Sequence, residues 1–519
     1  MYCVKEALVI LIQHGLVYFT EHNNDMKLDA TYYEINMKQI LMRLRMGRIM
    51  RVTEEYHGKA GSTICQLLFL NGRLKLSQVQ AWARMNQRDE ATYVKVFTKM
   101  AVDQFIIPSL PQHSRSIKDQ YLEAEKEELS KLKFTFKSPK KIMLIKDIAK
   151  ANMDALFQHE REQIEQIGMK RTAKYPLEPE TRKRFEQEQG TFHSGQENIP
   201  KEELLYDVEP HVFFVLNYNK YNVIFRNYLV SKFAIKRINR TAGMILKAFF
   251  RYCEDKSYQV GEDFSSAATP SYIANMLEPE LFKKGDIILD PKSIRLQQHT
   301  KTDNNQKKTP VVSEVVEGYF KLLQTDQAGF LKYRDDLGGN HYSVNFKKLR
   351  YVMKRTIFEN FLNDQFGIVC CRIVRILLDK GKLEETQIQK LAMLPLKDVR
   401  CKLNILMKHS IVEIQEVPRS SDHSTGRSFH LWFVSLDKCF EELLLNIYQT
   451  IVNLQQRKEE ELLRRKRLIN KLNRIDVIEN RDLLNKIDQA EVAKMENVVE
   501  KIEVAKERLD ELVMILQDI

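Results

Sequence analysis

Apolar side chains recur at three- and four-residue spacing between residues 396 and 410. The stripe consists of Leu396, Val399, Leu403 and Leu406. At about 100° per residue these positions fall on one side of a helix, which must then be buried. A shorter helix is predicted over Glu385–Met393, and Pro395 between the two favours a tight turn because its ring fixes the backbone. The pattern predicts a helix-turn-helix.

Two strand-like runs follow the second helix of this motif. Ile411–Val417 and Phe429–Val434 are rich in β-branched and aromatic residues, and the polar segment 418–427 joins them, which predicts a hairpin. With Cys371–Lys380 as a first helix, the whole is a winged helix. The alternative is a small α+β module whose helix only packs, and many winged helices bind proteins rather than DNA.

The same string occurs again near the start of the chain. Val4–Val17 aligns without gaps on Val399–Val412, and apolar residues coincide along most of it. A repeat of this kind predicts tandem copies of one building block. The expected fold class is therefore mainly α with small β wings, arranged as tandem winged-helix domains.

The C-terminal stretch has a different character. Leu436–Ile519 contains no proline or glycine, and its apolar residues follow heptad spacing. The periodicity slips near Asp476–Asp482, between two arms of nearly equal length, which predicts an antiparallel helical hairpin, a coiled coil within one chain. The alternative is one long helix that pairs with a partner chain.

The repeats and the composition shifts divide the chain into six segments. Only three residues precede Val4, so the first unit should lack its leading helices, either because the chain is incomplete or because this unit is truncated. The insertion is expected to be partly disordered, with some helix near Leu144–Ile167. The segments are 1–36, a partial first winged helix; 37–110, a second; 111–210, a charged insertion or linker; 211–353, a third; 354–435, a fourth; and 436–519, the hairpin.

Composition excludes several classes of protein. The 82 Lys and Arg against 70 Asp and Glu give a net charge of +12, which favours a polyanionic partner. The seven cysteines are scattered, which argues for core thiols and against a disulfide framework or structural zinc. No apolar run reaches membrane-spanning length and no signal sequence follows Met1, so an intracellular, soluble protein is expected. His57–Thr63 has P-loop residues in the wrong order, and we expect no catalytic residues, cofactor or metal.

Three stretches carry a resemblance to a known family: Val4–Val17, Leu67–Leu76 and Phe366–Ser435. The sequence resembles the third-largest subunit of DNA-directed RNA polymerase III, and in its winged helices it is similar to the alpha subunit of transcription factor IIE. The resemblance implies a non-catalytic nuclear subunit. Members join two smaller polymerase III subunits in a heterotrimer on the clamp of the largest subunit, engage initiation factors and help to open promoter DNA, for the synthesis of small RNAs such as tRNA and 5S rRNA. No membrane is involved.

Basic residues on the predicted helices and wing are the candidates for DNA contact. They are Lys397, Arg400 and Lys408 on the second helix of the helix-turn-helix in the fourth winged helix, Arg419 and Arg427 on its wing, and Lys236, Arg237 and Arg240 in the third winged helix. Such side chains would make salt-sensitive phosphate contacts rather than read bases. Two alternatives are a free-standing regulator that selects a palindromic site and a scaffold whose winged helices touch only protein.

Overall fold

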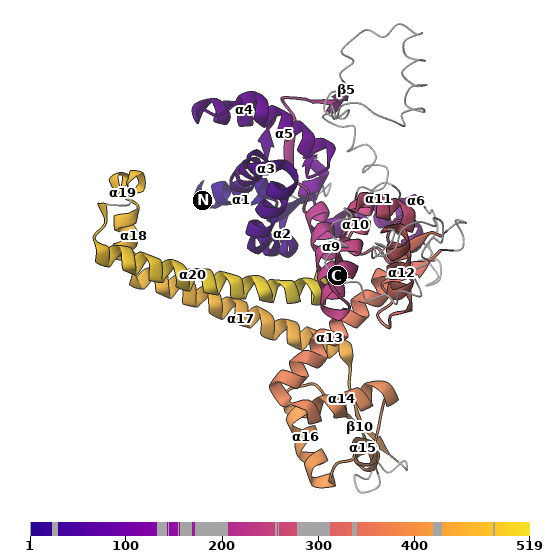
Figure 1. The fold of residues 1–519 in the computed structure, drawn as a ribbon. Helices are drawn as coiled ribbons and strands as arrows, with labels where there is room; N and C mark the ends of the chain where they lie inside the picture. The colour runs from indigo at the N-terminus through magenta and orange to yellow at the C-terminus, as the bar shows by residue number, and fades with distance from the viewer. Residues whose placement is uncertain are drawn as a thin grey trace, which may run out of the picture. The chain divides into compact units, whose positions relative to one another are not determined.

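The computed structural model shows a mainly helical protein with small antiparallel sheets (Figure 1), which confirms the predicted fold class. The structure describes residues 2–22, 30–109, 111–131, 143, 145–153, 155, 169–171, 206–254, 257, 259–277, 312–334, 340–418, 428–480 and 483–518. By internal contacts the chain divides into two units, Met1–Asn222 and Val223–Ile519. Each is described by itself.

The first unit opens with a helix and a hairpin. They are α1 (Tyr2–Gln13), β1 (Val17–His22) and β2 (Ala30–Ile35), with Val17 opposite Ile35 and His22 opposite Ala30. Asn36 fastens the hairpin, since its amide donates to the Gly15 carbonyl at 3.1 Å and to the Tyr18 hydroxyl at 2.7 Å. Val9 and Ile10 of α1 are exposed.

A complete winged helix follows. After α2 (Met37–Met42) and η1 (Arg43–Arg45) come α3 (Met46–Asn71), β3 (Leu74–Lys75), α4 (Leu76–Met85), α5 (Glu90–Val102), β4 (Ile106–Pro108) and β7 (Phe213–Leu216). The chain breaks the helical path of α3 at Gly58, where φ is 71°.

The wing of the second winged helix takes one strand from beyond the segment predicted over 111–210. β7 follows that segment, yet it is the central strand of the order β3-β7-β4, with Leu74 opposite Phe214 and Ile106 opposite Leu216. Phe214 and Leu216 point to the same side of the strand and are buried, so β7 completes the hydrophobic face of the wing. Residues between β4 and β7 are thus an insertion within the wing of the second winged helix rather than a linker between two winged helices.

The described part of this insertion begins with contacts to earlier elements of the same compact unit, Met1–Asn222. It contains η2 (Pro111–Ser114), α6 (Ile117–Lys131), the paired strands β5 (Met169–Arg171) and β6 (Tyr206–Val208), and helical residues 145–153. Thr20 Oγ1 donates to Asp119 Oδ2 at 2.6 Å, and Arg73 donates to Ser114 Oγ at 2.8 Å. The sequence reasoning missed α6; the rest of the predicted helix near Leu144–Ile167 lies outside the described residues.

The third winged helix lies mostly in the second compact unit, Val223–Ile519. Its elements are α9 (Tyr218–Arg237), which begins in the first unit, α10 (Arg240–Cys253), α11 (Pro270–Met276), α12 (Val312–Thr325), β8 (Leu331–Tyr333) and β9 (Tyr342–Val344). Isolated bridges join Phe264 to Asn345 and Ala268 to Tyr342 beside the wing. Phe249, Phe320 and Phe346 are buried in its core.

The last winged helix follows the sequence prediction closely. It consists of α13 (Phe346–Phe366), α14 (Ile368–Lys380), α15 (Glu385–Ala392), α16 (Leu396–Lys408), β10 (Glu413–Pro418) and β11 (Ser428–Phe433). Met393 ends α15 in the left-handed region with φ of 56°, immediately before the turn at Pro395. Leu383 bridges to Trp432, which closes the sheet.

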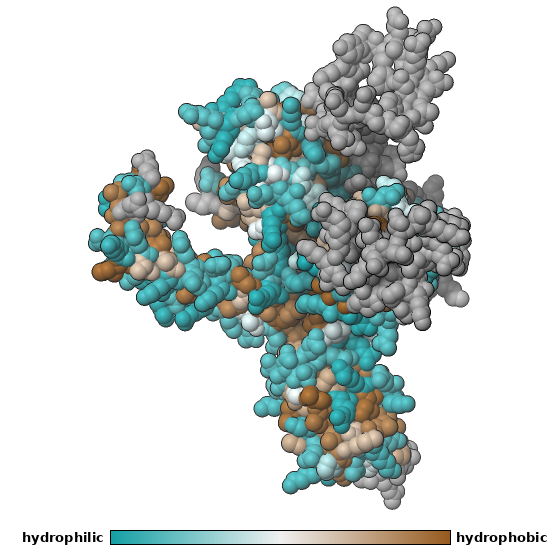
Figure 2. Space-filling model, in the orientation of Figure 1, coloured by the Kyte–Doolittle hydropathy of each residue, from teal (hydrophilic) through white to brown (hydrophobic). Residues whose placement is uncertain are grey.

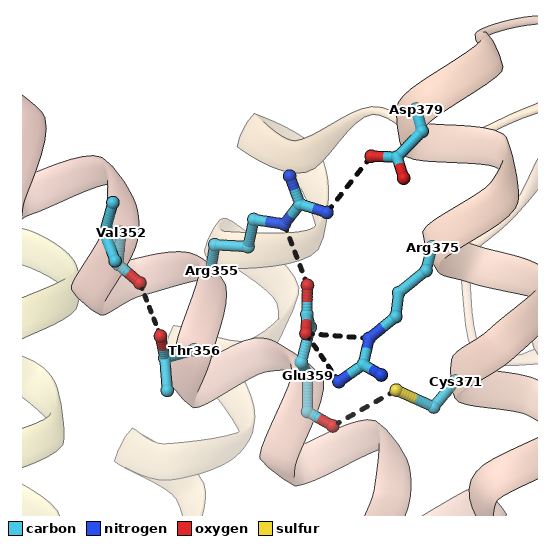
Figure 3. A network of polar contacts seen from close by, with 7 residues as sticks. All are labelled: Val352, Arg355, Thr356, Glu359, Cys371, Arg375 and Asp379. Carbon is cyan, nitrogen blue, oxygen red and sulfur yellow. Dashed lines mark hydrogen bonds and ion pairs between the residues drawn. The ribbon is translucent and has the colours of Figure 1, made fainter. Parts of the chain in front are cut away.

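A cluster of ions joins α13 to α14 (Figure 3). Glu359 Oε1 accepts from Arg355 Nε at 2.8 Å, and Glu359 Oε2 accepts from Arg375 Nε at 2.8 Å. Arg355 also reaches Asp379 at 3.2 Å, and the Cys371 thiol donates to the Glu359 carbonyl at 3.7 Å. One carboxylate therefore holds arginines from two consecutive helices.

The chain ends in a helical hairpin, as predicted. Its elements are α17 (Leu436–Arg464), α18 (Lys466–Leu472), α19 (Ile475–Glu479), α20 (Lys486–Val513) and the π-helical η8 (Met514–Asp518). Lys458 pairs with Glu503 at 2.6 Å and Lys506 donates to Gln455 at 2.8 Å, an offset in which one index rises by three as the other falls by three. This register is antiparallel, and Figure 1 shows α17 and α20 side by side.

The fourth winged helix and the hairpin share one core. Buried residues of α14 and α16 pack in the same cluster as Cys439, Leu443 and Ile447 of α17 and Val513 at the end of α20. The apolar stripe Val399, Leu403 and Leu406 lies within it. The base of the hairpin is thus anchored on the winged helix that carries α16.

Candidate nucleic-acid interface

Helix α16 presents a polar face opposite its buried stripe. Lys397, Arg400, Asn404 and Lys408 are exposed. At about 100° per residue they fall within one quadrant of the helix, on the side away from the buried Val399, Leu403 and Leu406. The amphipathic pattern of the sequence therefore fixes where the basic groups project.

One member of this face already has an acidic partner. Arg400 Nε lies 2.9 Å from Glu385 Oε2 of α15, with the arginine side chain 59% exposed and the glutamate 24%. An exposed pair of this kind contributes only about 0.2–1 kcal/mol, so a phosphate could compete for the guanidinium. Lys397 and Lys408 are the two remaining cations of this face.

The two wing candidates, Arg419 and Arg427, lie outside the described residues. The described strands on either side of them pair in register, with Pro418 opposite Ser428.

The candidates of the third unit lie where α9 passes into α10. Lys236 and Arg237 occupy the last turn of α9, and Arg240 begins α10; all three are exposed. Arg237 Nε lies 2.8 Å from Asp326 Oδ2, just after α12, so this arginine fastens the helix end within the unit. The structure brings these three together and gives Arg237 a structural partner.

One further basic residue of α9, Arg226, is structural. Arg226 is only 1% exposed, donates to the carbonyls of Gln259 and Val260, and lies 3.7 Å above the Phe346 ring. Burial lowers the pKa of Arg226 to about 10. Its guanidinium cannot reach a ligand in solution.

Sequence reasoning missed a polar cleft in the third unit. The cleft measures about 510 Å³ and lies between the first turns of α11 and α12 and the β8–β9 wing. Hydroxyl and imidazole groups dominate its lining: Thr269, Ser271, Ser313, Tyr333 and His341. These residues come from segments up to 72 positions apart, so no local motif could reveal them.

The described residues offer little for chemistry of other kinds. They contain no group of three or more His, Cys, Asp or Glu that could hold a metal ion, and no helix among them is long and apolar enough to cross a membrane. Burial raises the pKa of Cys65 to about 11 and that of Cys439 to about 12, so neither is a thiolate near neutral pH. Cys401, in contrast to the predicted core thiols, is exposed.

Two family models match the chain. Residues 95–353 match "RNA polymerase III subunit RPC82", and residues 358–434 match "POLR3C, C-terminal winged-helix domain". The second match covers α14, α15 and α16 and the wing described above, together with the end of α13.

Curated relatives extend the likeness to most of the chain. DNA-directed RNA polymerase III subunit RPC3 of Homo sapiens is 23% identical over 486 residues, which cover 92% of this chain and 79% of that protein. The corresponding protein of Emericella nidulans is 23% identical over 574 residues, which cover 99% and 92%. That of Dictyostelium discoideum is 28% identical over 268 residues, which cover 52% and 38%.

Relatives that align along nearly the whole chain carry one and the same name, and the two family models match residues 95–353 and 358–434 of it. The chain belongs to the family of the third-largest subunit of RNA polymerase III, a non-catalytic subunit that assembles with other subunits of that enzyme.

Proposed function

We propose that this chain serves promoter-specific initiation by RNA polymerase III in the nucleus, and that α16 of the fourth winged helix faces DNA. The subunit would join two smaller polymerase III subunits in a heterotrimer on the clamp, and there it would engage initiation factors and help to open promoter DNA. Family membership supports this assignment, since the relatives are named as subunits of the same polymerase.

The observation that carries the DNA contact is the polar face of α16. Lys397 and Lys408 lie three turns apart on one side of a helix whose other side is fixed in a shared core. The helix rises 1.5 Å per residue, so the two ammonium groups start from positions roughly 16 Å apart, which suits contacts to separate phosphates. The hairpin, anchored on that core, would dock on the polymerase.

The experiment is charge reversal in the assembled polymerase. Lys397→Glu together with Lys408→Glu should reduce crosslinking of this subunit to promoter DNA about tenfold at 150 mM salt and reduce the salt slope of binding by about two. The matched control is Lys494→Glu, an exposed lysine of α20 far along the hairpin. Unchanged DNA crosslinking would overturn the DNA contact.

The competing proposal for α16 is a protein-only contact. In that case the double reversal would weaken assembly with the other subunits and leave DNA protection unaltered. Affinity purification with mass spectrometry tests the heterotrimer separately, because the two smaller subunits should leave the polymerase together with this chain under mild dissociation.

A further inference from the structure

The far end of the hairpin exposes an unusual amount of apolar surface. Five large apolar side chains within 25 residues are each more than 60% exposed: Leu463, Ile475, Ile478, Leu483 and Ile487. We call this set the tip patch. It lies where α17 ends, α18 and α19 turn and α20 begins, and Figure 2 shows brown side chains at this end of the hairpin.

The tip patch is not needed to pack the tip. Leu468 of α18 and Val477 of α19 are 5% and 6% exposed and form the interior of this turn. Single exposed apolar residues are common on soluble proteins, but several gathered at one end of an element indicate an interaction site.

The stretch between Leu463 and Ile475 of the tip patch is basic. Residues 464–474 contain six Lys or Arg and no Asp or Glu. Four of these cations are paired within the hairpin: Arg464 and Arg465 with Glu461, Lys471 with Asp488, and Arg474 with Asp476. Lys466 and Arg467 have no ion-pair partner among the residues that the structure describes, and they leave a positive rim beside the apolar side chains.

We propose that the tip patch is a docking site for an acidic, amphipathic segment of another protein in the polymerase assembly. Apolar side chains of that segment would cover Ile475, Ile478 and Ile487, while its carboxylates would face Lys466 and Arg467. A positive rim opposite negative side chains sets the orientation and speeds encounter, and the apolar centre supplies most of the affinity. The inference rests on the proposed function, because the partner is sought within the assembled enzyme.

The hairpin geometry suits this role. The base of α17 and the end of α20 are held in the core of the fourth winged helix, so the tip lies at the opposite end of helices of 29 and 28 residues. At 1.5 Å per residue such a helix spans about 40 Å, which lets the tip engage a partner at a distance from α16.

The test uses a photo-crosslinking amino acid at Leu483 in the assembled polymerase, with peptides identified by mass spectrometry. We expect one main crosslinked segment, in a different subunit or initiation factor, with apolar residues flanked by Asp and Glu. Ile475→Asp with Ile478→Asp should lower the yield about tenfold or more, because burying each isoleucine is worth at least that factor. Lys466→Glu with Arg467→Glu should lower it in a salt-dependent way.

The matched control is Leu445→Asp, which alters an equally exposed apolar residue on the shaft of α17, 63% exposed. It should leave the yield unchanged. A basic crosslinked segment, a second copy of this chain, DNA or lipid as the main product, or a yield no higher than at Leu445 would each overturn the docking site. DNA crosslinking through α16 is measured in the same preparation, so loss of the tip contact alone leaves the proposed function standing.

Discussion

The ammonium group of Lys232 donates to both carboxylate oxygens of Glu511, at 2.8 Å to Oε1 and 2.7 Å to Oε2, although the two residues lie 279 positions apart in the sequence. The lysine belongs to α9 and the glutamate to α20, and both side chains are mostly buried, 35% and 21% exposed. This pair fastens the returning arm of the hairpin to the first helix of the third winged helix. One cation of α9 is therefore already paired within the protein.

Reversing this pair one residue at a time should be costly, and reversing both should recover part of the loss. Lys232→Glu places two carboxylates together and should lower the free energy of unfolding of residues 223–519 by about 1–2 kcal/mol. The double variant with Glu511→Lys should recover about 0.5–1 kcal/mol, as a double-mutant cycle measures. Hydrogen exchange of α9 and α20 peptides in the full chain is the readout. Strictly additive effects would mean that the two side chains do not interact.

The carboxylate of Glu359 should matter more than any other acid at the α13–α14 junction. Glu359→Gln removes the charge that holds Arg355 and Arg375 and should cost about 1–3 kcal/mol, since hydrogen bonds between charged groups are stronger than neutral ones. The pKa of Arg355 is raised chiefly by its hydrogen bond to Glu359. Asp379→Asn is the control, because Asp379 is 62% exposed and should cost under about 0.5 kcal/mol. Urea unfolding compares the two, and equal effects would contradict the central role of Glu359.

The sequence predicted the fourth winged helix almost residue by residue because local signals and burial agree there. The stripe of α16, the proline turn and the two runs of β-branched and aromatic residues are all local features. The antiparallel hairpin was also predictable, since its heptads slip at the point where the chain turns. Both are cases in which a short window carries the whole structural signal.

Long-range strand pairing could not be predicted by the same reasoning. β7 is too short for its sequence to indicate which wing it joins, and its partner strands lie more than 100 residues away. For the candidate DNA-contact residues, too, local properties could be predicted and long-range contacts could not. Exposure of Lys397 and Lys408 could be predicted from helical periodicity, but the partners of Arg400 and Arg237 depend on which elements meet in space.

Arg226 is a basic residue of α9 that the fold buries. Its planar guanidinium both donates to two carbonyls and lies over the Phe346 ring, and lysine can reproduce neither geometry in full. Arg226→Lys should lower the free energy of unfolding of residues 223–519 by about 1–3 kcal/mol. Arg251→Lys, an exposed position on α10, serves as the control and should be nearly neutral. Denaturant titration of the two variants decides, and a neutral Arg226→Lys would show that the buried contacts contribute little.

His57 should make the first unit sensitive to acid. Its side chain is fully buried, neither ring nitrogen has a hydrogen-bond partner among the described residues, and the ring packs edge-on against Phe105 at 4.7 Å. Burial, with a smaller contribution from the charge of Lys99, lowers the pKa of His57 from 6.5 to about 4. Between those two values the unfolded chain binds a proton that the folded chain does not, so stability rises with pH across this window. The stabilisation is complete above about pH 6.5 and is lost as the pH falls toward 4.

A shift of this size corresponds to a loss on the order of 3 kcal/mol between pH 7 and pH 4. His57→Phe keeps the ring and its contact with Phe105 but cannot take up a proton, so it should flatten that part of the pH profile even if it changes the stability at pH 7. His211→Phe, a substitution of an exposed histidine, is the control and should leave the slope intact. Hydrogen exchange of α3 and α5 peptides between pH 4 and 7, corrected for intrinsic exchange rates, measures both. A wild-type profile that already lacks the slope would mean that His57 becomes protonated without unfolding, through the carboxylate of Asp103 at 3.7 Å.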